Sequence, residues 1–157
     1  MANAFGVNIL RLLLTTFVAL LVLPMCVSAQ EDENWPSLTY LRHDYKSVSV
    51  VAHVRVQQAE ITGRIGGYEN WRLVATVVEP FKGKFKKDEV IEFFHGAEAG
   101  FKQEWFIGEK IVFLLAERDQ DRKLHYAVLE NSTLPHNDDR VKKLRSIKRS
   151  FSSKRSR

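Results

Sequence analysis

The chain has almost no cysteine, and this absence restricts what it can be. Among its 157 residues the single cysteine is Cys26, so neither an intramolecular disulfide nor a cysteine-rich zinc site can form. The chain also lacks the glycine-rich loops that bind nucleotide phosphates and the G-x-S-x-G turn of serine hydrolases. We therefore expect a domain that is held together by its hydrophobic core.

Charge is nearly absent from the first 29 residues, where Arg11 is the only charged side chain. An apolar run, Leu12–Leu23, follows it, and the small residues Val27 and Ala29 fit a signal peptidase site. We predict that residues 1–29 are a secretory signal peptide cleaved after Ala29. The mature protein is then exported, either secreted or periplasmic.

The same segment leaves two alternatives open. The 18 residues from Leu12 to Ala29 are marginal for a membrane span, which needs about 20, so an uncleaved membrane anchor is one alternative. A lipid attached to Cys26 is the other, although Met25 stands where a bacterial lipobox has a small residue. Cleavage after Ala29 would remove the only thiol from the mature chain.

The rest of the chain carries the alternating pattern of β-strands. Residues 30–46 form an N-terminal lead-in, in which Leu38–Tyr45 fits either a short helical turn or an extended segment. From Val48 to Val56 apolar and polar residues alternate, with Val51 as the exception, which predicts a strand with one buried face. Residues 61–67 contain three glycines and predict a turn. Further strands are predicted at Tyr68–Glu79, Glu89–His95, Lys110–Glu117 and Lys123–Glu130.

Five strands joined by turns are typical of a small closed or nearly closed antiparallel β-barrel, here at residues 47–135. A helix is predicted from Asp138 to Arg149, because apolar residues recur at helical spacing after an acidic pair that suits the positive end of a helix. Residues 136–157 are therefore expected to be a C-terminal basic helix with a disordered tail. The fold class is all-β with a C-terminal α-helix.

Two motifs within this pattern resemble a known family. They are VATVVEPFKG at 74–83 and FIGEKIVF at 106–113, with a short strand, Val90–Phe94, between them. Over about residues 48–129 this arrangement resembles the netrin-like module, which tissue inhibitors of metalloproteinases share with many bacterial exported proteins. The resemblance implies an OB-fold, a five-stranded barrel with a helix packed on it.

The chain departs from this family at its N-terminus. The inhibitors chelate the protease zinc with an N-terminal cysteine and have several disulfides, whereas the predicted mature chain begins at Gln30 and has no cysteine. The resemblance therefore supports the scaffold rather than zinc-chelating inhibition. Protease inhibition without that cysteine is an alternative function.

No group of residues has the spacing of a catalytic or metal site. The five histidines follow no ligand pattern, and we expect them at the surface or rim, with no metal and no cofactor; they are His43, His53, His95, His125 and His136. The paired carboxylates fit turns and a helix cap. We therefore predict a protein without enzymatic activity. A small hydrolase that uses His53 or His95 with neighbouring acids is an alternative.

Positive charge is concentrated at the C-terminus. Residues 140–157 hold nine basic and no acidic residues, whereas residues 30–139 hold 14 basic and 19 acidic ones, a net charge of −5. Such a segment can bind an anionic surface. The candidate binding residues are Lys142, Lys143, Arg145, Lys148 and Arg149, with a second group in a predicted loop, Lys82, Lys84, Lys86 and Lys87.

Aromatic residues offer another candidate binding face, formed by Tyr68, Trp71, Phe93 and Trp105. On nucleic-acid-binding OB-folds such rings stack on bases, but export argues against that partner, and the alternative is that the rings fill the core. Asn131 begins an N-S-T sequon, which matters only in a eukaryotic secretory pathway.

We expect an exported, monomeric, non-catalytic binding module for a protein or an anionic envelope component. It would reach that partner through the barrel face or the basic C-terminal segment.

Overall fold

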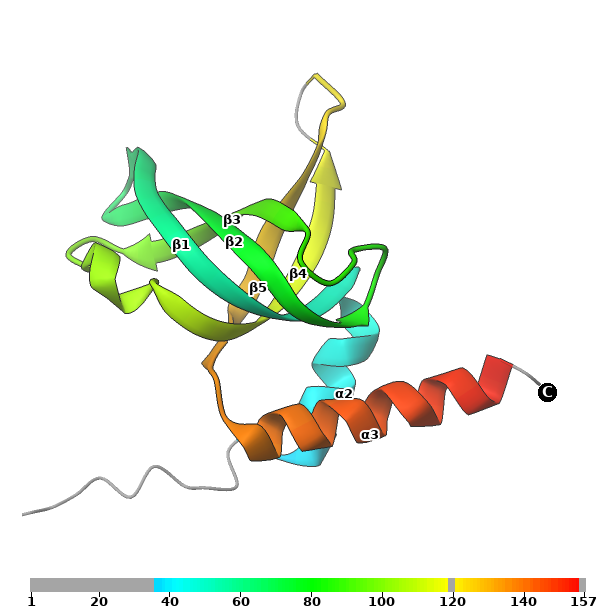
Figure 1. Ribbon diagram of the computed structural model, residues 1–157. Coiled ribbons are helices and arrows are strands. Elements are labelled where there is room, and N and C mark those ends of the chain that lie inside the picture. Colours follow the sequence, from blue (N-terminus) through cyan, green and yellow to red (C-terminus); the bar gives the residue numbers. More distant parts are fainter. Residues whose placement is uncertain (1–35, 119–120, 156–157) are drawn as a thin grey trace, which may run out of the picture. The chain divides into compact units, whose positions relative to one another are not determined.

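The computed structural model describes residues 36–118 and 121–155 (Figure 1). The predicted signal peptide, residues 1–29, lies outside the described residues. Within the described part, no helix combines the length and the apolar character that a membrane span requires. The elements are α2 (Leu38–Ser47), β1 (Val50–Ile65), β2 (Tyr68–Lys82), β3 (Val90–Glu98), the 3₁₀ turn η1 (Gln103–Trp105), β4 (Gly108–Arg118), β5 (Leu124–Pro135) and α3 (Asp138–Arg155).

The predicted fold class is confirmed, since the five strands close into an OB-fold-like barrel in the order β1-β2-β3-β5-β4. The expectation that all strand pairs are antiparallel is wrong, because β3 and β5 pair in parallel at Phe94 and Ala127. The reason is geometric. Strand directions can alternate all the way around a ring only if the number of strands is even, so a closed ring of five has at least one parallel pair.

The connection between β1 and β2 is tighter than predicted. Only Gly66 and Gly67 form the turn, with φ values of 58° and 85°, and Ile61–Ile65 continues β1. Positive φ at both central residues is what a two-residue β-hairpin requires, and glycine adopts it without strain. The two strands therefore form one long hairpin that reaches Ile65 and Tyr68.

The helices also differ from the predictions. Leu38–Ser47 is helical, and Ser37 begins it by accepting a hydrogen bond from the Tyr40 amide at 3.2 Å. Helix α3 extends to Arg155, beyond the predicted end at Arg149. The ring of Phe151 stacks on Tyr45 of α2 at 5.4 Å, so tertiary packing stabilises the last turns that the sequence alone assigned to a tail.

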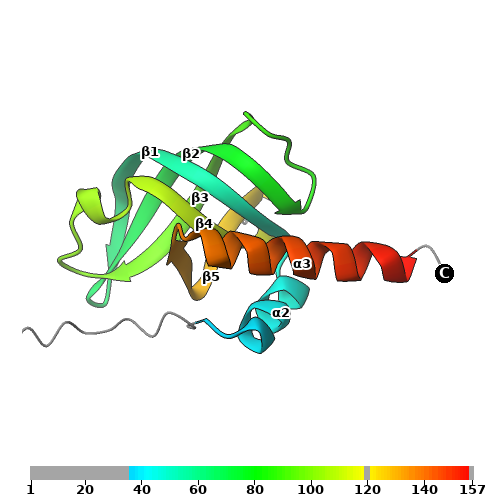
Figure 2. The ribbon, with the colours of Figure 1, turned by 60° about the horizontal axis from the view of Figure 1, so that its bottom comes forward.

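Two apolar clusters make up the core, and β1 contributes to both. Inside the barrel, Val50, Ala52 and Val54 pack with residues of the other strands. On the outer face, Val51 packs with side chains of β4, α2 and α3, which explains why it breaks the alternation in the sequence. Figure 2 shows α3 running across one end of the barrel with α2 beside it. The helices thus cover a second buried face of the sheet.

Candidate functional site

Helix α3 is fixed to the end of β2 by two basic side chains. Arg145 donates to both carboxylate oxygens of Glu79, at 3.0 and 2.7 Å, and the Lys148 ammonium donates to the Pro80 carbonyl at 2.8 Å. The hydrogen bond from Arg145 lowers the pKa of Glu79, and Glu79 in turn raises the pKa of Arg145. Pro80 and Lys148 line one pocket beside α3, and Glu79 and Arg145 line a second.

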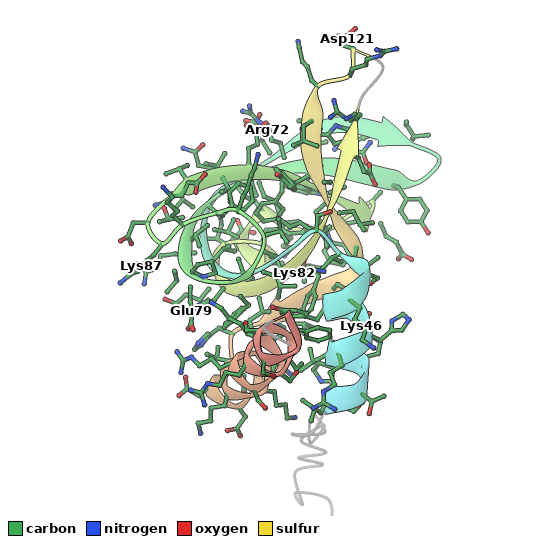
Figure 3. All side chains as sticks on the ribbon, turned by 90° about the vertical axis from the view of Figure 1, so that its right-hand side faces the viewer. Lys46, Arg72, Glu79, Lys82, Lys87 and Asp121 are labelled. Atoms are coloured by element: carbon green, nitrogen blue, oxygen red, sulfur yellow. The ribbon has the colours of Figure 1, made fainter. Side chains whose placement is uncertain are left out.

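The first pocket, which we call the basic pocket, lies between α2, the end of β2 and α3 and has a volume of about 530 Å³. Its basic residues are Lys46, Lys82 and Lys148, and its rings are those of Tyr45, Phe81, Phe85 and Phe151. Figure 3 looks toward the C-terminal end of α3 and shows Lys46 on α2, with Lys82 between it and Lys87 in the view. The pocket therefore combines positive charge with an apolar wall.

Lys82 has a structural role in this pocket. Its ammonium donates to the carbonyls of Tyr45 and Lys46, at 2.7 and 3.2 Å, and to that of Val48, so it binds the C-terminal end of α2. A cation suits this position, because the unpaired carbonyls at the C-terminal end of a helix carry partial negative charge. Lys82 was predicted to bind a ligand, whereas in the structure its ammonium binds carbonyl groups of the protein's own backbone.

Gly83, next to Lys82, is a position that only glycine fits. Its φ is +101°, and a Cβ there would lie 2.9 Å from Cγ2 of Val50 and 3.1 Å from the carbonyl oxygen of Ser49. The neighbouring Phe81 is buried, and its carbonyl accepts a hydrogen bond from the Tyr45 hydroxyl at 2.7 Å. The Phe81-Lys82-Gly83 motif thus fixes α2 to the end of β2.

The two predicted basic groups meet beside α3. Lys87, from the loop after β2, lines a second pocket of about 480 Å³ together with Lys142 and Arg145 of α3. Lys142 also pairs with Asp139 at 3.1 Å. The remaining predicted residues are Lys84, Lys86 and Arg149, which are exposed, and Lys143, which is half-buried.

The second pocket also contains two histidines, and we call it the histidine pocket. His53 of β1 and His136, between β5 and α3, stack with ring centroids 4.4 Å apart. Both face Glu109 of β4: its Oε2 lies 3.1 Å from Nε2 of His53 and 3.9 Å from Nδ1 of His136. Arg55 donates to the other oxygen of Glu109 at 2.7 Å.

The expectation that the histidines lie at the surface or rim is wrong for His53, of which 6% is exposed. Burial, and secondarily the neighbouring His136, lower its pKa below the ordinary value, so His53 is neutral at pH 7. The pKa of Glu109 is also lowered, chiefly by the hydrogen bond from Arg55. The pocket therefore presents neutral imidazole beside an ionised carboxylate.

No sequence spacing signals this cluster, because its members come from two strands and a connection that are far apart in the chain. Antiparallel pairing sets Arg55 of β1 opposite Glu109 of β4. His53 precedes Arg55 by two residues and points to the same face of β1, so its side chain also lies near Glu109. The backbone amide of His136 donates to the Glu109 carbonyl at 3.3 Å and brings the third member in. His95, the other proposed catalytic histidine, lies instead on β3, with Nδ1 3.4 Å from the Thr133 hydroxyl.

The predicted aromatic face is divided by the barrel. Trp71 and Phe93 are buried in the core, as the alternative interpretation held, whereas Tyr68 and Trp105 are more than half exposed. Asn131 lies within β5, which continues beyond the predicted strand end at Glu130 to Pro135, and its side chain is outside the described part of the structure. Its glycosylation stays a prediction.

No family model matches the chain, and a search of curated proteins finds no match either. The two pockets beside α3 are therefore the basis for assigning a function.

Proposed function

We propose that this protein is an exported, non-catalytic binding module that attaches to an anionic phospholipid surface through the basic pocket. The observation that carries the proposal is the composition of this pocket. Lys46 and Lys148 supply positive charge from two helices, and Phe85 and Phe151 line an apolar wall within the same space of about 530 Å³. A lipid presents both matching features, an anionic headgroup and the apolar chain below it.

The positive charge of Lys148 in the basic pocket is not neutralised by an ion pair with an acidic side chain among the described residues. The hydrogen bond of Lys148 is to a backbone carbonyl, which carries no net charge that would neutralise the ammonium. Each lysine close to an anionic membrane contributes on the order of 1 kcal/mol, and salt weakens that contribution. The exposed Lys84 and Lys86 follow Lys82 in the chain and extend the positive region beyond the pocket.

Vesicle binding tests the proposal directly. The protein is sedimented with vesicles of phosphatidylglycerol and of phosphatidylcholine over a salt series, and binding is expected only to the anionic vesicles and to weaken with salt. Lys46→Gln with Lys148→Gln should lower the affinity about tenfold or more. The matched control, Lys102→Gln with Lys123→Gln, removes the same charge from the β3–β4 and β4–β5 connections and should change little.

The unsubstituted protein and both double variants must carry the same N-terminal segment, so that its own affinity for lipid is equal in all three. Equal binding to both kinds of vesicle would contradict the proposal. So would an equal loss of affinity in the control variant.

We also propose that the barrel is of the netrin-like type. What supports this is the structural use of the Phe81-Lys82-Gly83 motif, in which a buried ring, a helix-binding ammonium and a glycine with positive φ each have a separate role. The proposal concerns the scaffold and does not extend to zinc-chelating inhibition.

A further inference from the structure

The histidine pocket contains donor atoms of a kind that the proposed attachment to lipid does not use. His53, Glu109 and His136 each offer one ligand atom, and these three atoms lie within 4.8 Å of one another. We propose that the three residues bind a divalent transition metal ion, with zinc as the best fit. Two imidazole nitrogens and one carboxylate oxygen form a three-ligand set that zinc uses when its fourth position stays open.

The spacing of the donor atoms is close to what zinc requires. With bonds of about 2.0–2.1 Å in a tetrahedral arrangement, ligand atoms lie roughly 3.3 Å apart. The distance from His53 Nε2 to Glu109 Oε2 is 3.1 Å, so this pair already has that spacing. His136 Nδ1 lies 3.9 Å from the same oxygen, and its side chain is 30% exposed, which leaves it room to rotate inward.

Neighbouring charged side chains face two of the three ligands, Glu109 and His136. Arg55 binds Oε1 of Glu109 and leaves Oε2 directed at the imidazoles, which favours a carboxylate that binds metal through one oxygen. Asp138 Oδ1 lies 3.8 Å from Nε2 of His136, on the opposite side of the ring from Glu109. A carboxylate that accepts a hydrogen bond from the second nitrogen of a metal-binding histidine orients the ring and strengthens it as a ligand, and Asp138 would take this role by closing from 3.8 Å to hydrogen-bond distance when the metal binds.

The site also has space for a fourth ligand. The histidine pocket measures about 480 Å³, and His53 and His136 lie in its wall. Lys87 and Lys142 line the same pocket, so an anion or a water molecule on the metal would meet positive charge there. Imidazole and carboxylate donors favour zinc, copper or nickel over magnesium and calcium, which prefer sites built wholly from oxygen.

Metal titration of the full chain, prepared without a polyhistidine tag, tests the proposal. A Cys26→Ser background removes the one thiol as a competing ligand. Calorimetry with Zn²⁺ is expected to show one site per chain, and Co²⁺ is expected to give the visible absorption of a four-coordinate centre. Mg²⁺ and Ca²⁺ at the same concentrations are expected to bind far more weakly.

Variants then identify the ligands. His136→Ala should lower the zinc affinity by more than about tenfold, and Asp138→Asn by about tenfold, because it loses only the group behind the ligand. His43→Ala is the matched control, since that imidazole is 82% exposed on α2 and is not part of the cluster. Circular dichroism establishes that each variant is folded, and Glu109→Gln replaces His136→Ala if the latter does not fold.

Three results would overturn the proposal. The first is the absence of one-to-one zinc binding by the chain with histidines intact. The second is an affinity that neither His136→Ala nor Glu109→Gln lowers more than the His43 control does. The third is equal affinity for zinc and magnesium, which would indicate nonspecific binding to exposed carboxylates.

Discussion

The hydroxyl of Ser132 on β5 donates a hydrogen bond to Oδ2 of Asp44 on α2 at 3.1 Å, and both residues are almost fully buried. This bond joins residues 88 positions apart and connects the first described helix to the last strand. It lies beside the apolar cluster between the helices and the barrel. Because it satisfies a buried carboxylate, it contributes to the position of α2 and hence to the shape of the basic pocket.

Asp44→Ala should therefore destabilise the fold. Removing the acceptor of a buried hydrogen bond costs about 1–3 kcal/mol, and we expect the free energy of unfolding in urea to fall by that amount. A double-mutant cycle with Ser132→Ala measures the coupling between the two residues. Glu98→Ala, at an exposed position on β3, serves as the control and should change stability by less than about 0.5 kcal/mol. Strictly additive effects of the Asp44 and Ser132 substitutions would contradict this account.

Gly83→Ala should be more damaging than Gly66→Ala. Both glycines have positive φ, +101° and +58°, so alanine is strained at either position. At Gly83 the new Cβ would also lie 2.9 Å from Val50, whereas at Gly66 no atom lies within 4 Å. We expect a loss of about 1–2 kcal/mol for Gly66→Ala and a clearly larger loss for Gly83→Ala, measured by thermal or urea unfolding. Equal losses would show that the contact with Val50 relaxes without cost.

Stability should decline as the pH falls through the range in which histidine titrates. Burial lowers the pKa of His95 below 6.5, so the folded state binds this proton less readily than the unfolded state does. The contribution is complete above about pH 6.5 and is lost as the pH drops toward the folded pKa. Urea unfolding between about pH 5 and pH 8 should show this slope, and His95→Gln should reduce it. An unchanged slope in the variant would assign the pH dependence to other groups.

Parts of the fold follow from neighbouring residues and were predictable for that reason. The alternation of Val50, Ala52, Val54 and Val56 indicates a buried strand face whatever the rest of the chain does. The adjacent Gly66 and Gly67 suit a tight turn, although their place within the predicted turn became clear only from the strand pairing. The helical spacing of Val141, Leu144 and Ile147 likewise predicted the helix, and all three residues are buried.

Other features depended on contacts between distant parts of the chain. The last turns of α3 form because Phe151 meets Tyr45, and β3 lies parallel to β5 because a ring of five strands must close. Lys82 resembled its neighbour Lys84 in the sequence, yet only Lys82 lies at the end of α2 and binds its carbonyls.

The sequence by itself determined the strands, the C-terminal helix and the separation of a basic segment from an acidic domain, because each depends on residue spacing or on charge counts along a short stretch. Only the tertiary structure decided which side chains meet. His53 lies on β1, Glu109 on β4 and His136 between β5 and α3. The register between β1 and β4 brings the first two together, and the hydrogen bond from the His136 amide to the Glu109 carbonyl brings in the third. Closure of the barrel also buries Trp71 and leaves Tyr68 exposed. The exposure of a side chain depends on which residues pack against it in space, and the residues beside it in the chain do not determine that.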